Sequence, residues 1–240
     1  MRHGIVGLSE IPFQAMSDSS NLKQCEPWRI VVVDDHPMVR ERLAEVINRE
    51  ADLQVCGEAE DRFQALEVIA SVLPDLAIVD LTLKNSSGLD LIKDLRAMHP
   101  SVKILVVSMQ EESLYAERVL RAGAQGYITK QEATRNVLLA IRQVRAGEVY
   151  VSSAIANKIA STLVGHQRVG SEGGVATLAD RELQVFELIG DGFNTREIAD
   201  QLHLEVKTIE TYRARIKEKL RLRDSSELLR NAIAWTHRHS

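Results

Sequence analysis

Short apolar runs alternate with amphipathic segments five times between residues 29 and 146, and this alternation constrains the fold more than any other feature. The runs are Arg29–Val33, Leu53–Glu58, Leu76–Val79, Val102–Ser108 and Gly126–Lys130. Such short, almost continuously apolar runs are typical of strands buried on both faces of a parallel sheet. Five β–α units in succession predict a doubly wound, five-stranded parallel sheet with helices on both faces, which is the flavodoxin-like α/β architecture.

The pattern changes after about residue 150. Ser152–Val164 has the spacing of an amphipathic connecting helix, and Gly165–Thr177 contains four glycines without an apolar period, which predicts a flexible linker. Beyond it only helical patterns occur, at Asp180–Gly190, Thr195–Leu202, Val206–Leu220 and Ser225–Trp235. We therefore predict a flexible extension at 1–28, an α/β domain at 29–150, a connecting helix and linker at 151–177, and an all-α domain at 178–240.

Composition narrows the class of protein. The net charge is −4, so a surface for nucleic acid has to be local. The two cysteines, Cys25 and Cys56, lie in unrelated contexts, which argues against a disulfide framework or a cysteine-based zinc site. The N-terminal residues lack the apolar core of a signal peptide, and no apolar run has the roughly 20 residues that span a bilayer. We expect a cytoplasmic protein without a membrane segment.

Polar residues that could bind a metal ion or take part in a reaction stand at the ends of the predicted strands. Asp34 and Asp35 end the first, Asp80 the third and Ser108 the fourth, while Lys130 follows the fifth. The carboxyl ends of parallel strands open onto one edge of the sheet. Three carboxylates repel one another unless a hard cation such as Mg²⁺ neutralises them. Each residue alone is more typical of a helix cap or a surface charge, but together they indicate a site that accepts a phosphoryl group on a carboxylate.

The motifs VVVDDHP, VDLTLKNSSG, VVSMQ and YITK together resemble the receiver domain of two-component response regulators, over roughly residues 28–150. The resemblance implies Asp80 as phosphoryl acceptor, Asp35 as a direct Mg²⁺ ligand, Asp34 as a ligand through water, the Thr82 carbonyl as a further ligand, Ser108 and Tyr127 as the switch pair, and Lys130 as the phosphate clamp. This chain has Leu83-Lys84 where the family often has Met-Pro, and Gln131 where it often has Pro.

The C-terminal part predicts a helix-turn-helix, because only three residues separate Thr195–Leu202 from Val206–Leu220. A helical wheel places Val206, Ile209, Ile216 and Leu220 on one side, with small and polar residues opposite and basic residues on the flanks. A helix in a major groove needs this layout, since polar groups meet base edges and cations meet phosphates. A solvated basic helix face is the alternative.

Residues 177–238 resemble the LuxR/NarL-type DNA-binding domain of response regulators. The resemblance implies base reading by Glu210, Thr211 and Ala214, and contacts to the DNA backbone by Lys207, Thr208, Tyr212, Arg215 and Lys217. The wheel adds Lys219 as a phosphate contact. The last helix resembles the family's dimerisation helix. Ala179 replaces the usual capping threonine, so we expect Asp180 to cap its helix.

The resemblance predicts a transcription regulator of the NarL/FixJ type that is not an enzyme. Its receiver would take phosphate from a sensor histidine kinase, with Mg²⁺, and control DNA binding by a homodimer. Three alternatives remain: an orphan regulator that binds DNA without phosphorylation, a Mg²⁺-dependent aspartyl-phosphate hydrolase, and a quorum-sensing regulator with the same DNA-binding domain. The complete set of acids, Ser108 and Lys130 argues against the orphan regulator and favours a receiver that is phosphorylated.

Overall fold

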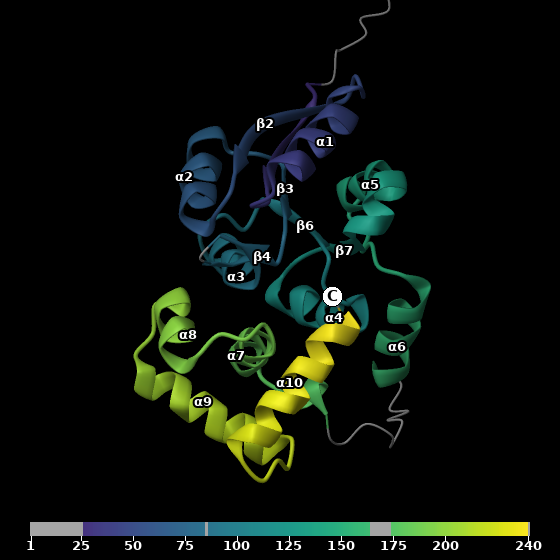
Figure 1. Ribbon diagram of the computed structural model, residues 1–240. Helices are drawn as coiled ribbons and strands as arrows, with labels where there is room; N and C mark the ends of the chain where they lie inside the picture. Colours follow the sequence, from purple (N-terminus) through teal and green to yellow (C-terminus); the bar gives the residue numbers. More distant parts are fainter. Residues whose placement is uncertain (1–25, 85, 164–173, 240) are drawn as a thin grey trace, which may run out of the picture.

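The computed structural model describes residues 26–84, 86–163 and 174–239 (Figure 1). They form an N-terminal α/β domain and a C-terminal helical domain, which contact each other. Most of the predicted extension and of the linker lie outside the described residues. The first strand begins at Trp28, the last residue assigned to the extension. Among the described residues, no helix has both the length and the apolar character needed to cross a membrane.

The N-terminal domain contains the predicted five-stranded parallel sheet, in the order β2-β1-β3-β6-β7. Its strands are β1 (Trp28–Val33), β2 (Leu53–Ala59), β3 (Leu76–Val79), β6 (Lys103–Ser108) and β7 (Gly126–Thr129). The central strands β1 and β3 are buried on both faces, which explains why their sequences are apolar without alternation. The order turns back at β1 and β3, so the carboxyl ends of these two strands form the crevice where such sheets place their sites.

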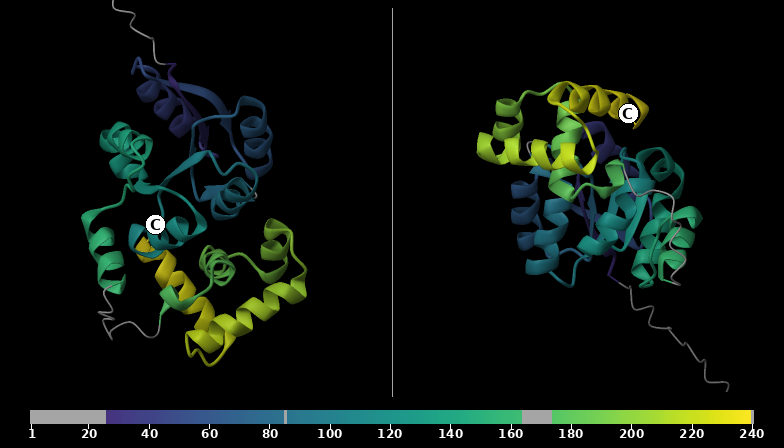
Figure 2. Two further views of the ribbon diagram at one scale, coloured as in Figure 1. Left: turned by 180° about the vertical axis from the view of Figure 1, so that it is seen from behind. Right: turned by 90° about the horizontal axis from the view of Figure 1, so that it is seen from below.

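Helices cover both faces of this sheet (Figures 1 and 2). One face packs on α1 (Pro37–Asn48) and α5 (Lys130–Arg145), the other on α2 (Arg62–Val72), α3 (Gly88–Met98) and α4 (Glu112–Ala122). Alternate residues of β1 supply the two cores: Val31 and Val33 belong to the α2–α4 side, and Ile30 and Val32 to the α1–α5 side. The doubly wound α/β prediction is therefore confirmed.

A feature absent from the prediction follows β3. Residues Thr82–Leu83 (β4) and Ser86–Ser87 (β5) pair as a short antiparallel ribbon. The Leu83 side chain is buried, so the residue that replaces the family's usual methionine serves as a core residue. Gly88 begins α3 directly after the ribbon. A Cβ atom there would lie 1.9 Å from the backbone oxygen of Asp80, so only glycine permits α3 to start this close to the strand end.

The segment after α5 returns to the sheet before it leaves the domain. Tyr150 forms a parallel bridge with Gly126, and its carbonyl accepts a hydrogen bond from the Tyr127 N–H at 2.8 Å. The connecting helix α6 (Ser153–Leu163) then packs beside α4 (Figure 1). The Glu112 carboxylate of α4 accepts a hydrogen bond from the Ser152 N–H at 2.8 Å. The predicted connecting helix is present and lies against the receiver-like domain.

The C-terminal domain consists of a 3-10 turn and the four predicted helices: η1 (Val175–Thr177), α7 (Asp180–Gly190), α8 (Thr195–Leu202), α9 (Val206–Lys219) and α10 (Ser225–His239). Its core joins α7 to α10, where the Phe186 and Trp235 rings meet edge to face at 5.9 Å. The Asn194 side chain caps α8 by accepting hydrogen bonds from two backbone N–H groups.

Val206 lies on the apolar side of the wheel but is 40% exposed, because it stands in the first turn of α9, ahead of the packed Ile209 and Ile216. One local prediction about this domain was wrong. Asp180 does not cap α7; the N-cap is Ala179, whose backbone N–H donates to the Glu182 carboxylate at 2.8 Å. The half of a capping box that needs only the Glu182 carboxylate is thus present although Ala179 has no capping side chain, and the Asp180 carboxylate contacts the other domain instead.

Candidate functional site

Two acids and one lysine form the centre of the site at the carboxyl ends of β1 and β3. Asp34 and Asp80 are almost fully buried, at 2% and 3% exposure. The Lys130 ammonium lies between them, with Nζ 2.7 Å from Asp34 Oδ2 and 2.7 Å from Asp80 Oδ2. Residues 34, 80 and 130, widely separated in the sequence, therefore meet as predicted. A single cation between two buried carboxylates leaves the cluster with excess negative charge.

Two other carboxylate oxygens of the cluster have no hydrogen-bond partner. Among the described residues, Asp35 Oδ1 and Asp80 Oδ1 are the buried side-chain polar atoms without a hydrogen-bond partner. One ligand atom each from Asp34, Asp35, His36 and Asp80 lies within 4.8 Å of the others. Unsatisfied buried carboxylate oxygens are costly unless a cation binds them. The donor set fits a divalent metal ion.

Burial and charge oppose each other within this cluster. Burial raises the pKa of Asp80, and the Lys130 ammonium reverses only part of that rise. Burial by itself lowers the pKa of Lys130, but Asp80 and Asp34 more than compensate, so its pKa is raised. Lys130 therefore stays protonated at neutral pH.

The predicted switch residues lie next to this cluster. Ser108 is fully buried, and its hydroxyl accepts a hydrogen bond from the Gln110 N–H at 3.4 Å. The Tyr127 hydroxyl donates to the Gln110 carbonyl at 2.6 Å, and burial strongly raises its pKa. Thr82 is exposed and lies beside the other domain. Its role as a carbonyl ligand stays a prediction.

The second predicted surface lies on α9. Glu210, Thr211 and Ala214, the predicted base readers, are exposed, as are Lys207 and Arg215. Thr208, Tyr212 and Lys217 are half-buried. The helix lies on the side of its domain away from the receiver-like domain (Figure 1). Its polar face is therefore accessible in this arrangement.

Lys219 has a partner that the wheel did not indicate. Its ammonium lies 2.6 Å from the buried carboxylate of Glu182, which also accepts the Ala179 N–H. Lys219 thus fixes the end of α9 to the start of α7. Its predicted contact with a DNA phosphate stays a prediction, and it competes with this internal ion pair.

Comparison with known proteins assigns the family. Residues 30–142 match the response regulator receiver domain, and residues 176–232 match the bacterial regulatory proteins of the luxR family. The oxygen regulatory protein NreC of Staphylococcus haemolyticus is 33% identical over 209 residues, which cover 85% of this chain and 96% of that protein. NreC of Staphylococcus aureus strain MRSA252 is 32% identical over 209 residues, with the same coverage.

The chain belongs to the LuxR-type response regulators. It is a two-component regulator in which a receiver is joined to a LuxR-type DNA-binding domain, so the predicted family and class of function are confirmed.

Solved structures of other response regulators have a similar fold. A LuxR-family response regulator from Aurantimonas sp. SI85-9A1 matches with a TM-score of 0.53 and 34% identity, and the match covers 58% of this chain and 99% of that one. A structure of the RcsB response regulator from Salmonella typhimurium gives a TM-score of 0.69, covering 87% of this chain and 98% of that one. At 24% identity, RcsB supports the shared fold alone.

The two domains of this response regulator meet at a contact that no sequence motif predicted. The Arg118 guanidinium on α4 donates to Asp180 at 3.1 Å, to the Leu178 carbonyl at 2.7 Å and to the Ala176 carbonyl at 3.1 Å. Lys93 on α3 binds the same Asp180 at 2.7 Å. One receiver arginine therefore holds the segment that leads into α7.

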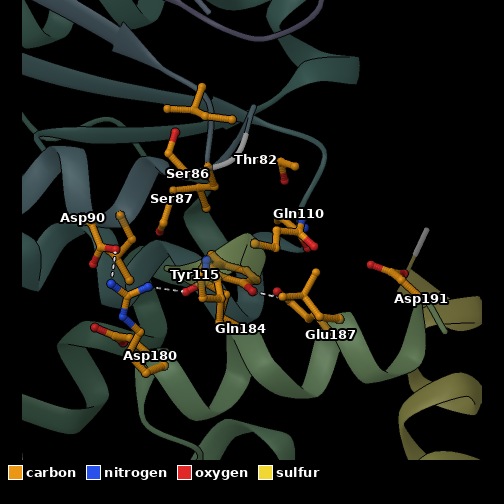
Figure 3. Close-up of a pocket in the computed structure, with 17 residues that line it drawn as sticks. Thr82, Ser86, Ser87, Asp90, Gln110, Tyr115, Asp180, Gln184, Glu187 and Asp191 are labelled. Atoms are coloured by element: carbon orange, nitrogen blue, oxygen red, sulfur yellow. Dashed lines mark hydrogen bonds and ion pairs between the residues drawn. The ribbon is translucent and has the colours of Figure 1, made fainter. Parts of the chain in front are cut away.

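A cavity of about 130 Å³ lies between the domains beside this contact (Figure 3). Arg181 reaches across it to Asp90 at 2.7 Å, and the Tyr115 hydroxyl donates to the Glu187 carboxylate. Burial raises the pKa of Glu187 to about 7, although Tyr115 and Arg118 oppose that rise. Gln110, whose carbonyl accepts a hydrogen bond from the Tyr127 hydroxyl, lines the same cavity. Gln110 therefore contacts both residues of the switch pair and also lies at the domain interface.

The C-terminal end of α10 also reaches the receiver. A larger cavity is lined by Met109–Ser113, which span the loop after β6 and the first turn of α4, by Thr129 and Gln131 next to Lys130, and by Arg238 of α10. The end of α10 therefore lies near the edge of the sheet that carries Asp80 (Figures 1 and 2).

Proposed function

We propose that Asp80 accepts a phosphoryl group from the phosphohistidine of a sensor histidine kinase, and that the modification controls promoter binding by α9. The observation that carries this proposal is the geometry of the Asp80 carboxylate. Its Oδ2 is held by Lys130, while its buried Oδ1 has no hydrogen-bond partner and faces the acidic cluster. An anion held on one side and unsatisfied on the other is suited to act as a nucleophile.

The transfer is a displacement at phosphorus. A lone pair of Asp80 forms the new O–P bond as the N–P bond of the phosphohistidine breaks, and the leaving imidazole keeps the bonding electrons. Lys130 and the Ser108 hydroxyl, next to the carboxylate, would then bind the phosphoryl oxygens. The Gln110 backbone N–H donates a hydrogen bond to the Ser108 hydroxyl. If this hydroxyl turns toward the new phosphoryl group, we expect Gln110 to move with it.

Asp35 Oδ1, Asp80 Oδ1 and Asp34 would hold Mg²⁺, with Thr82 contributing its carbonyl. When bound, the ion neutralises charge on the phosphoryl oxygens. The unpartnered carboxylate oxygens support this assignment. Lys130 occupies the opposite oxygens of Asp34 and Asp80, so ammonium and metal would share the cluster without competing for the same atoms.

For the second domain, we propose that α9 enters a major groove as part of a homodimer of the phosphorylated form, joined through α10. Glu210, Thr211 and Ala214 would read bases; Lys207, Thr208, Tyr212, Arg215, Lys217 and Lys219 would contact the DNA backbone. One short helix reads few base pairs, so two half-sites raise affinity through effective concentration. The protein would act in the cytoplasm as a regulator and not as an enzyme.

Mass measurement after incubation with Mg²⁺ and a small phosphodonor tests the acceptor. The wild type gains one phosphate and Asp80→Asn gains none. Asp35→Asn loses the dependence on Mg²⁺, whereas Cys56→Ala, a variant elsewhere in the receiver, behaves as wild type. Labelling of Asp80→Asn contradicts the proposal. Sustained turnover of the phosphodonor instead favours a hydrolase, and unchanged DNA binding favours an orphan regulator.

A further inference from the structure

The loop after β1 places a nitrogen ligand at the acidic cluster. The backbone N–H of His36 donates a hydrogen bond to Asp34 Oδ1 at 2.9 Å, and this turn brings the His36 side chain back over the end of the strand. As a result, His36 Nδ1 lies 3.2 Å from Asp34 Oδ1 and 2.6 Å from Asp35 Oδ1. Nδ1 thus faces the acids, although the side chain is 63% exposed.

The short distance between His36 Nδ1 and Asp35 Oδ1 is not a well-directed hydrogen bond, since Asp35 Oδ1 is left without a hydrogen-bond partner. A second, independent feature is the Asp80 carboxylate, which is 97% buried and directs its unpartnered Oδ1 into the same cluster. The His36 nitrogen and one carboxylate oxygen each from Asp34, Asp35 and Asp80 therefore lie close together. The first three residues are consecutive, and Asp80 stands at the end of the neighbouring strand.

We propose that His36 is a fourth metal ligand, through Nδ1, and that this pocket consequently binds Zn²⁺ and related divalent transition ions more tightly than Mg²⁺. The inference rests on the proposed function, because it uses the pocket assigned there to Mg²⁺. It adds a ligand and an order of metal preference that the carboxylates alone do not supply.

The chemistry of the donors gives the preference. Mg²⁺ takes octahedral oxygen ligands and keeps several waters, so it gains little from an imidazole. Zn²⁺ takes four ligands at about 2.0–2.2 Å and binds imidazole and carboxylate together. Ligand atoms around such an ion lie about 3.4 Å apart. The four atoms here, all within 4.8 Å, reach that arrangement with small side-chain movements.

The exposed position of His36 gives a route for the ion and a safe site for substitution. The acids beneath it are held by Lys130 and the sheet, so removing the imidazole leaves the fold intact. A purely orienting role for His36 makes a different prediction: loss of the imidazole would then disturb Asp34 and Asp35 and weaken every metal equally.

Calorimetric titration of the full chain with Zn²⁺ and with Mg²⁺ separates these roles. His36→Gln weakens Zn²⁺ binding at least tenfold and leaves Mg²⁺ binding within twofold. His237→Gln, an exposed histidine on α10, changes neither, and Asp35→Asn weakens both. An unchanged Zn²⁺ affinity in His36→Gln, or an equal loss for both metals, overturns the proposal.

Electron paramagnetic resonance of the Cu²⁺-loaded protein gives a direct readout. The wild type shows nitrogen coupling from one imidazole, and His36→Gln loses it; coupling that survives the substitution overturns the proposal. The mass assay with Mg²⁺ keeps the two hypotheses apart. Phosphorylation of Asp80 with no effect of His36 on Zn²⁺ removes only this inference, whereas His36-dependent Zn²⁺ binding without phosphorylation removes only the proposed function.

Discussion

The acidic pocket holds a buried carboxylate and the interface between the domains holds a half-buried one. Burial raises the pKa of both, yet the two regions neutralise them differently. Asp80 has the full charge of Lys130 at 2.7 Å. Glu187 has the neutral hydroxyl of Tyr115, with a smaller opposing effect of the Arg118 charge, and burial raises its pKa to about 7. The Lys130 ammonium therefore favours the ionised form of Asp80, which a site for cations and phosphoryl groups needs. The interface carries a group whose charge changes near neutral pH, so the contact is easily weakened.

The largest effect is expected where the pocket loses its cation. Lys130→Met leaves the buried Asp34 and Asp80 carboxylates facing each other, which costs about 3–5 kcal/mol of folding free energy. Urea unfolding at pH 7 without added metal measures this loss. The matched change Lys84→Met removes an ammonium paired with the exposed Glu60, and we expect a much smaller loss because water screens that pair. Equal losses would show that the pocket does not depend on its counter-charge.

The next effect belongs to the interface. Arg118→Ala removes three hydrogen bonds that cross between the domains, and we expect it to weaken their contact by about 2–3 kcal/mol. Hydrogen exchange of α7 and the radius from small-angle scattering report the opening. Arg121→Ala, one turn along α4, breaks only an exposed pair with Glu117 and leaves both measurements unchanged. Opening in both variants would mean that the contact has no specific anchor.

A third test concerns the exposed charged residues of α9, which, unlike those of the pocket and the interface, we expect to act on DNA. Glu210→Ala relaxes preference at one base pair by about 1–3 kcal/mol, because a carboxylate has no favourable Coulomb energy with DNA and can accept from a cytosine amino group. Lys207→Ala weakens all sequences alike and lowers the salt slope by about one phosphate contact. Titration of half-site variants at two salt concentrations measures both. If Glu210→Ala tightens every sequence equally, Glu210 has no reading role.

The smallest effect concerns pH. Glu187 has a pKa of about 7 in the closed protein against an ordinary value of 4.5, so it binds its proton more tightly when closed. Its contribution to stability is complete below about pH 4.5 and is lost as pH rises through about 7. We expect the loss to be about 1 kcal/mol, since solvent reaches the half-buried group. The groups facing it are Tyr115, Arg118 and Asp191.

Glu187→Gln keeps the neutral form at all pH values. Thermal unfolding between pH 5 and 8 should therefore vary less with pH in this variant than in the wild type. Glu218→Gln, on the exposed face of α9, serves as the control and keeps the wild-type profile. An identical profile in Glu187→Gln would show that the carboxylate titrates without affecting the contact.

The sequence alone determined the parallel sheet and the residues at its edge. Strands buried on both faces must be apolar, and parallel topology brings their carboxyl ends together. Asp34, Asp80 and Lys130 therefore had to meet, whatever the details of the helices around them. The exposed polar face of α9 followed in the same way from a period of 3.6 residues and a three-residue turn.

The tertiary structure decided which surface charges find partners. Tyr115 and Glu187 are 72 residues apart, and Arg118 and Asp180 are 62 apart, on helices whose local sequences are equally compatible with exposure to solvent. The pairing of Lys219 with Glu182, the ribbon of β4 and β5, and the turn that directs His36 onto the acids likewise depend on which backbone arrives beside them. Hydrophobic periodicity fixes the face that a helix buries, because burial is a local property of the pattern. It does not fix the partner of an exposed charge, because that free energy is small and is set only when two folded surfaces meet.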